Sequence, residues 1–280
     1  MLCFRCAPFE TFNMQLETIY TKSISSPSKG TVLLLHGACF GAWCWQNNLQ
    51  PWLAQQGFDV CAMSLRNHGK SEWKGSLKFR RIKEYIQDLA SVVDQLEGPV
   101  FLIGHSMGGF IIQHYLGKQP SAKVQKAVLL CAVPPHGAWR VTLKTLIHHP
   151  LTFIKANLTW SLAPIFVNAQ RARQYMFSPA FSDERFQEIL LQIQDESYLG
   201  YLDTLFLDLP DPKHVTTPVM VVGGEQDYLF PPADVIATAK AYHTEPYLVK
   251  GAAHNFFMEE GWEEVAEKMR DFFGAEKGER

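Results

Sequence analysis

Residues 100–109 read VFLIGHSMGG, a buried apolar strand that runs straight into a Gly-x-Ser-x-Gly turn. A helical segment begins directly after the turn, which is the context in which this motif is meaningful. The turn is so tight that the residues two positions before and after the serine nearly touch, so both must be glycine, and the serine takes a strained backbone. The strain lifts the Ser106 hydroxyl clear of the sheet at a helix N-terminus. The stretch therefore predicts a nucleophilic serine at position 106.

Apolar runs of strand length lie on both sides of this turn along the chain and alternate with segments of helical periodicity. Residues 14–21 alternate apolar and polar side chains, as a half-exposed antiparallel edge strand does. Short strands that alternate with helices predict a mostly parallel sheet with helices on both faces. We expect the other strands over 32–35, 58–63, 100–103, 127–131, 219–222 and 246–249, and helices over 45–56, 82–96, 107–117, 233–242 and 262–273.

The alternation stops near Pro134 and resumes at Thr217. The intervening residues read as helices and loops, so we expect a core made of 1–133 and 217–280 and a helical insertion over 134–216, after the sixth or seventh strand. Within the insertion, 157–170 carries no charge and is rich in large apolar side chains. Two roles fit this stretch: a helix packed on the body of the protein, or an apolar wall over a substrate pocket. The side chains concerned are Leu158, Trp160, Leu162, Ile165, Phe166 and Val167.

A serine at its free pKa is a poor nucleophile and needs a base, usually a histidine whose ring is fixed by a carboxylate. Ten histidines compete, but in this architecture the order along the chain is serine, acid, histidine. His254 directly follows the last predicted strand, whereas His243 precedes it, so His254 is the predicted base. Both Glu225 and Asp227 follow an earlier strand. Asp227 lies farther into the loop, within reach of the histidine, and is the predicted acid; Glu225 is expected to cap or face solvent.

Acyl transfer also needs backbone N–H donors for the oxyanion. The N–H of Met107, at the start of the helix after the nucleophile, supplies the first. The second is expected from Ala38 in the loop LHGACFG at 35–41, where small residues let the backbone approach a substrate. His36, beside a glycine at a strand end, is expected to brace this loop.

The composition excludes several classes of function. The chain has 280 residues, 47% of them apolar, and 26 Lys plus Arg against 28 Asp plus Glu, a net charge of −2 that offers no field for nucleic acid or an anionic membrane. We expect no transmembrane segment, since no apolar run is long enough, and no signal peptide. Six sparse cysteines suit reduced thiols and a cytoplasmic location. Cys3 and Cys6 have the spacing of a redox or metal pair but lack partner ligands, and a frayed terminus is the alternative. The sequence does not indicate whether the protein is a monomer or an oligomer.

Taken together, these motifs resemble the α/β-hydrolase family over about residues 16–273. The resemblance rests on LHGA at 35–38, LRNHGKS at 65–71, GHSMGG at 104–109, GEQD at 224–227 and AH at 253–254. It implies an α/β-hydrolase fold with a mostly parallel eight-stranded sheet, a mobile helical cap over 134–216, and a Ser106–His254–Asp227 triad with Ala38 and Met107 at the oxyanion. Asn67 departs from the glycine of many members, which should affect a turn and not the triad.

Two branches of the family are similar in part. HGACFGAWCW at 36–45 is similar to the opening of plant methyl esterases and hydroxynitrile lyases, and the segments around Asp227 and His254 look more like bacterial proteins often labelled lysophospholipases. The resemblance implies a serine hydrolase that cleaves a small carboxylic ester with a hydrophobic acyl or alkyl group through an acyl-enzyme, of carboxylesterase, lysophospholipase or monoacylglycerol-lipase type. No metal or organic cofactor is expected. The fold also hosts C–C bond hydrolases, lyases, perhydrolases and ligand receptors, which stay as alternatives.

Overall fold

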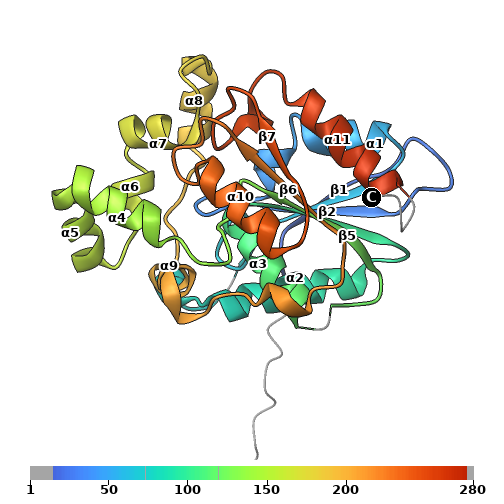
Figure 1. Ribbon diagram of the computed structural model, residues 1–280, viewed down its shortest axis with the longest axis horizontal. Coiled ribbons are helices and arrows are strands. Elements are labelled where there is room, and N and C mark those ends of the chain that lie inside the picture. Colours follow the sequence, from blue (N-terminus) through green and yellow to red (C-terminus); the bar gives the residue numbers. More distant parts are fainter. Residues whose placement is uncertain (1–14, 73, 119, 276–280) are drawn as a thin grey trace, which may run out of the picture.

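The protein is described by a computed structural model over residues 15–72, 74–118 and 120–275. At its centre lies one sheet with the strand order β1-β3-β2-β4-β5-β6-β7 (Figure 1). The first pair, β1 with β3, is antiparallel, and the other pairs are parallel, so the predicted mixed edge and parallel body are confirmed. The strands are β1 (Thr18–Thr21), β2 (Thr31–Leu35), β3 (Asp59–Met63), β4 (Val100–His105), β5 (Val124–Leu130), β6 (Val219–Gly224) and β7 (Pro246–Val249).

The sheet has seven strands in the described residues, so the expected count of eight is wrong for this part of the chain. The count of eight came from the family resemblance and not from a pattern in these residues. Only β1 precedes β2 in the described residues, and the helical insertion therefore follows β5, not the sixth or seventh strand. Cys3 and Cys6 lie outside the described residues.

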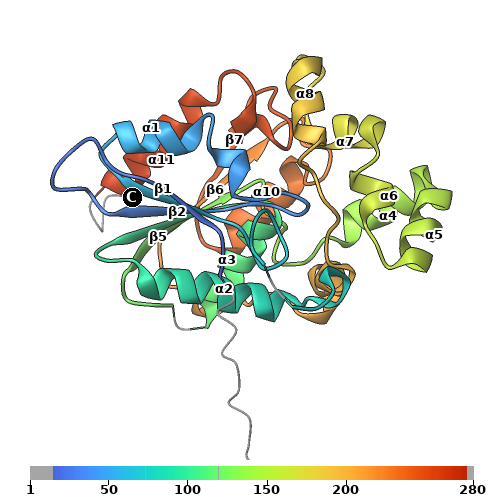
Figure 2. The same ribbon diagram turned by 180° about the vertical axis from the view of Figure 1, so that it is seen from behind.

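Helices cover both faces of the sheet, with α1 and α11 on one side and α2 and α3 on the other (Figures 1 and 2). The expected helix at 45–56 begins only at Leu49, after a 3₁₀ turn at Ala42–Trp45, because Asn47 and Asn48 are weak helix formers. The other core helices match their predicted ranges within two residues. The core helices are α1 (Leu49–Gln55), α2 (Ile82–Gln95), α3 (Met107–Gly117), α10 (Pro232–Ala241) and α11 (Glu263–Gly274).

Between β5 and β6 the chain forms a separate group of helices, which we call the inserted helices. Three of them, α4, α5 and α6, form the end of the molecule farthest from the sheet in both views (Figures 1 and 2). No helix in the described ranges is long and apolar enough to cross a bilayer. The inserted helices are α4 (Trp139–His148), α5 (Pro150–Thr159), α6 (Ala163–Phe166), α7 (Ala169–Met176), α8 (Asp183–Leu190) and α9 (Tyr198–Leu202).

The hydrophobic core lies around the two central strands. Every residue of β2 and β4 is buried, as expected for parallel strands covered on both faces. Because these strands are fixed by packing on both sides, the loops at their carboxyl ends leave the sheet from rigid positions. Those loops carry Ala38 and Ser106.

Candidate active site

Ser106 sits in the strained turn that the sequence predicts. It follows β4 directly and caps α3 with φ of +51° and ψ of −116°, a backbone conformation that side-chain-bearing residues rarely adopt. A Cβ on Gly104 would lie 2.7 Å from the carbonyl carbon of Gly108, and one on Gly108 would lie 2.5 Å from the backbone oxygen of Leu35. The close approach that requires both glycines is therefore confirmed.

His254 and Asp227 form a buried hydrogen-bonded pair. His254 Nδ1 and Asp227 Oδ2 are 2.8 Å apart, and the other carboxylate oxygen accepts the N–H groups of Leu229 and Phe230 at 2.8 and 3.0 Å. These contacts fix the carboxylate, and the carboxylate in turn holds a proton on Nδ1 and leaves Nε2 as the basic nitrogen of the ring. The pairing of His254 with Asp227 expected from chain order is present.

Ser106 and His254 both line one cavity of about 80 Å³, together with Ala38 and Met107. No hydrogen bond joins the Ser106 hydroxyl to His254 in the described ranges, a common state of such a pair when no substrate is bound. Most of the remaining wall is apolar and comes from the inserted helices and from the β6–α10 loop. These residues include Val141, Leu162, Phe166, Met176, Leu229 and Phe230.

The uncharged stretch 157–170 plays both of the roles that its sequence allows. Leu162 and Phe166 line the cavity, and Ile165 is buried in the core. Leu158 and Trp160 instead point to solvent, with exposed fractions of 79% and 47%. Only the second half of the stretch therefore forms an apolar wall.

The two amides expected at the oxyanion both border this cavity. In the described residues neither the Ala38 N–H nor the Met107 N–H donates a hydrogen bond, so both remain available. The residue after Ala38, Cys39, has φ of +69° and is held from two sides: Gln194 N donates to its carbonyl at 3.0 Å, and its own N–H donates to Glu196 Oε2 at 3.1 Å. The inserted segment thus holds the loop next to the predicted oxyanion donor.

Glu196 is a buried carboxylate with four hydrogen-bond donors around it. His68 Nε2 lies 2.9 Å from Oε2, while Tyr85 Oη and Ser197 N lie 3.2 and 2.6 Å from Oε1. Since His68 Nδ1 also faces an acceptor, the carbonyl oxygen of Arg66 at 3.1 Å, both ring nitrogens carry protons and His68 is an imidazolium.

The charges of this pair reinforce each other. Burial opposes both charges, but the attraction between them and the hydrogen bonds outweigh it: the pKa of His68 is raised from its ordinary value of 6.5, and the pKa of Glu196 is lowered from 4.5. The sequence alone did not reveal Glu196, because nothing local marks a glutamate 128 residues away as the partner of His68.

Two further histidines orient the loops of the site. His36 accepts the N–H of Leu65 at Nε2 and donates from Nδ1 to the Gly37 carbonyl at 2.7 Å, so it braces the loop as predicted. Burial, and then the charge of His68, lower the pKa of His36 to about 3, which keeps it neutral. His105 donates from Nε2 to the backbone oxygen of His254 at 3.1 Å, and its pKa is also lowered, by burial first.

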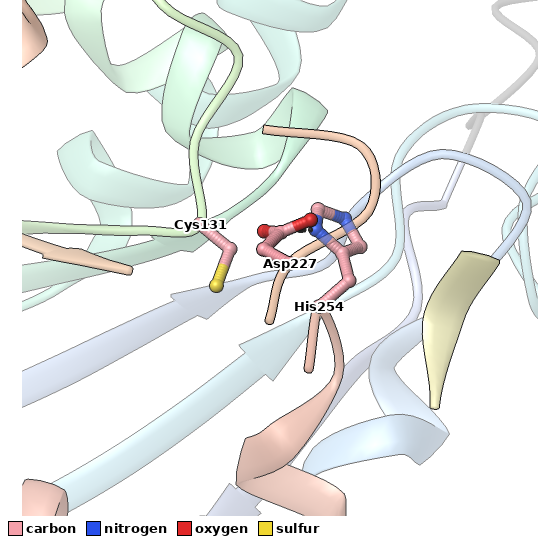
Figure 3. Close-up of side chains that lie close together, drawn as sticks. All are labelled: Cys131, Asp227 and His254. Carbon is pink, nitrogen blue, oxygen red and sulfur yellow. Dashed lines mark hydrogen bonds and ion pairs between the residues drawn. The ribbon is translucent and has the colours of Figure 1, made fainter. Parts of the chain in front are cut away.

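Cys131 lies beside Asp227 and His254, directly after β5 (Figure 3). Its sulfur and one atom each of Asp227 and His254 fall within 4.8 Å of one another, which suggests a metal site. The chemistry does not fit a metal. Burial, and then the Asp227 carboxylate, raise the pKa of the Cys131 thiol, which opposes formation of the thiolate that a metal binds, and His254 Nδ1 is already bound to Asp227 Oδ2. The carboxylate is already shared with His254 and two amides.

The competing candidates lie away from the cavity. Glu225 is exposed and accepts the N–H of Gly251 at 3.2 Å, the minor role expected of it. His243 is exposed in a turn after α10. Asn67, at the position where a family glycine is usual, has φ of +63°, a conformation that asparagine tolerates better than most residues, so the turn keeps its shape.

Known proteins resemble this chain over different lengths. Methylesterase 3 of Arabidopsis thaliana is 31% identical over 109 residues, which are 38% of this chain and 41% of that protein. A bifunctional esterase/perhydrolase of Acinetobacter calcoaceticus is 38% identical over 101 residues, 32% of this chain and 35% of that protein. The matched part therefore spans well under half of these relatives.

The fold has matches over nearly the whole chain. The crystal structure of a monoacylglycerol lipase from Paleococcus ferrophilus superposes with a TM-score of 0.70 at 20% identity and covers 93% of this chain and 98% of that one, which bears on the fold alone. The family model described as alpha/beta hydrolase family matches residues 32–268. With the sheet, the strained serine turn and this match in agreement, the chain belongs to the alpha/beta hydrolase family.

Proposed function

We propose that this protein is a serine hydrolase that cleaves small carboxylic esters with a hydrophobic acyl or alkyl group. The observation that carries the proposal is that Ser106, the His254–Asp227 pair and two backbone N–H groups without an acceptor in the described residues meet at one apolar cavity. The two N–H groups are those of Ala38 and Met107. Esterases among the relatives point the same way, and no metal or cofactor is needed for this chemistry.

The proposed reaction has two steps. His254 Nε2 takes the proton of Ser106, whose oxygen attacks the acyl carbonyl, and the N–H groups of Ala38 and Met107 stabilise the oxyanion. The alcohol leaves with the proton from His254, so Ser106 carries the acyl group. Water then attacks the acyl-enzyme with the same base, and the acid is released. Asp227 holds the imidazole in the required tautomer and stabilises its charged form.

The inserted helices, and with them residues 134–216, are proposed to act as a cap over this cavity. Val141 of α4, Phe166 of α6 and Leu162 at the N-cap of α6 contribute to its wall. The rest of the chain, 1–133 and 217–280, would be the catalytic core. An apolar wall favours a hydrophobic group on the substrate. A cavity of about 80 Å³ suits a short acyl group in the described conformation.

A cytoplasmic location is part of the proposal. The four cysteines in the described ranges are all buried free thiols, as is usual in a reducing compartment. The four are Cys39, Cys44, Cys61 and Cys131.

The test combines covalent labelling with turnover. We expect a fluorophosphonate probe to label the wild type and not Ser106→Ala, and p-nitrophenyl esters of graded chain length to be hydrolysed by the wild type alone. His254→Ala should abolish turnover, while His243→Ala, at an exposed position, serves as the matched control and should keep it. Absence of labelling at Ser106, or equal losses in the two histidine variants, would refute the assignment.

Perhydrolysis is the second candidate, because one relative is a bifunctional esterase/perhydrolase. Here hydrogen peroxide replaces water as the attacking group on the acyl-enzyme, so a peroxy acid and free Ser106 are formed. Adding peroxide to the ester assay separates the two functions. Formation of peroxy acid at a rate comparable to hydrolysis favours the second candidate, and hydrolysis unaffected by peroxide favours the first.

A further inference from the structure

The outer side of α4 and α5 exposes an unusual amount of apolar surface. Eight of the sixteen large apolar side chains that are exposed in the described residues fall within residues 139–160. Ile147, Leu151 and Leu158 have exposed fractions of 65%, 81% and 79%. Exposed apolar side chains in such density mark an interaction surface. The eight are Trp139, Leu143, Leu146, Ile147, Leu151, Ile154, Leu158 and Trp160.

The same segment is strongly basic although the whole chain is nearly neutral. Residues 138–182 contain five Lys plus Arg and no Asp or Glu, which leaves 21 basic and 28 acidic residues in the rest of the chain. The net charge of −2 therefore conceals a segment of +5 that runs from α4 to α7. Arg140 is paired with Asp234 and Arg173 with Asp183, which leaves Lys144, Lys155 and Arg171 without an ion pair in the described residues. A field of this sign attracts an anionic surface.

A groove of about 540 Å³ lies beside the apolar side chains, between α5 and α7, and three cations line it. Lys78 Nζ donates to the Thr159 carbonyl and Arg171 to the Pro164 carbonyl, while the Lys155 ammonium has no hydrogen-bond or ion-pair partner in the described residues. Hydroxyl and amide groups and three apolar residues, Ala163, Pro164 and Val167, complete the lining, which contains no carboxylate. The hydroxyl and amide side chains are those of Thr152, Thr159, Ser161 and Asn168.

The carboxylate of Asp195 does not neutralise this groove. It accepts the Ser161 hydroxyl at 2.5 Å and the N–H groups of Leu162 and Ala163 at 2.9 and 2.8 Å. Its charge is thus directed to backbone amides beneath the groove. Three cations with hydrogen-bond donors around them and apolar side chains beside them match an anionic headgroup with an acyl layer next to it.

We propose that the outer side of α4 and α5 docks on an anionic lipid surface. A headgroup phosphate binds in the groove of Lys78, Lys155 and Arg171, and Ile147 and Leu151 enter the acyl layer. A second copy of the chain is a poor occupant, because it would bring the cations Lys144, Lys155 and Arg171 of two copies together. Since α4 also lines the catalytic cavity through Val141, docking places that cavity at a source of lipophilic ester, a consequence that rests on the proposed function.

The test measures binding without turnover, so it is independent of whether the ester hydrolase proposal holds. The Ser106→Ala protein is sedimented with vesicles of phosphatidylcholine alone or mixed with phosphatidylglycerol, at low and high salt. We expect binding to the mixed vesicles, weakened by salt. Leu151→Ser should weaken it about tenfold, and Lys155→Ala about fivefold.

Matched controls lie elsewhere on the surface. Leu191→Ser removes an apolar side chain that is 89% exposed after α8, and Lys240→Ala removes an exposed charge on α10; neither should change binding. Melting curves confirm that each variant is folded. The proposal is overturned by equal binding to both kinds of vesicle, by no binding, or by equal losses in the controls. A dimer that Leu151→Ser dissociates, or binding of inorganic phosphate without vesicle binding, which would mean an adventitious ion only, also overturns it.

Discussion

Replacing Glu196 by glutamine tests the buried ion pair that joins the inserted segment to the core. The substitution keeps the size of the side chain and one acceptor oxygen but removes the charge that faces His68. The two side chains are 1% and 0% exposed, so neither charge can be compensated by water. Removing one partner of such a pair costs ~3–5 kcal/mol of unfolding free energy. For a chain of 280 residues this corresponds to a fall in Tm of about 5–9 °C.

The pH dependence of this loss has a definite sign. The raised pKa of His68 contributes stability that is complete below 6.5 and is lost as the pH rises through the folded-state value. The lowered pKa of Glu196 contributes stability above 4.5 that is lost as the pH falls through its folded-state value. The difference in stability between wild type and Glu196→Gln should therefore be largest between about pH 4.5 and 6.5 and should shrink above that window.

The assay is urea unfolding of wild type, Glu196→Gln, His68→Gln and the double variant across this pH range. If the pair is ionised, the double variant loses less unfolding free energy than the two single variants combined, and the coupling free energy is about 1–3 kcal/mol. Additive losses, or a single loss below about 1 kcal/mol that does not vary with pH, would show that the pair is not ionised and refute the reasoning.

Three further outcomes are expected from the site. Asp227→Asn should lower kcat for ester hydrolysis by roughly 10⁴-fold because the wrong tautomer of His254 is held, while circular dichroism shows an unchanged fold. Gly108→Ala should abolish activity and lower Tm, because its Cβ would lie 2.5 Å from the backbone oxygens of both Leu35 and His36; an active and stable variant would disprove the close approach. Treatment with a metal chelator should leave the hydrolysis rate unchanged, since the Asp227 carboxylate beside Cys131 is already shared with His254 and two backbone amides, and loss of activity that zinc restores would contradict this.

The parts of the site that could be predicted from sequence are those fixed by short-range geometry. The contact between Gly104 and Gly108 follows from the steric demands of one turn, so a ten-residue stretch suffices to predict it. The pairing of Asp227 with His254 follows from chain order, because both residues come directly after parallel strands that are neighbours in the sheet. Neither inference depended on the position of the inserted helices, because the segment between β5 and β6, described over its whole length, contains no strand that would fix its place in the sheet.

The parts that could not be predicted depend on contacts between residues far apart in the chain, or on how charge is distributed over the folded surface. Neither is visible in a short stretch of sequence. The number of strands was taken from the family and not from the residues, which is why it differs from the seven strands of the described residues. Net charge is a sum over the chain, so it hides the separation between a basic end and an acidic remainder. An anionic membrane was excluded as a partner from the net charge of the whole chain alone.

Glu196 shows why these missed contacts matter for the chemistry. Residues 194–196 hold the Cys39 peptide at both its N–H and its carbonyl, and Cys39 follows the amide that is proposed to stabilise the oxyanion. We therefore expect a movement of the inserted segment at this point to change the direction of the Ala38 N–H, which belongs to the preceding peptide. A misdirected donor costs transition-state stabilisation of about 2.7–4 kcal/mol. The inserted segment that lines the cavity and the loop that carries the proposed oxyanion donor are thus joined by a charged pair whose two residues lie 128 positions apart.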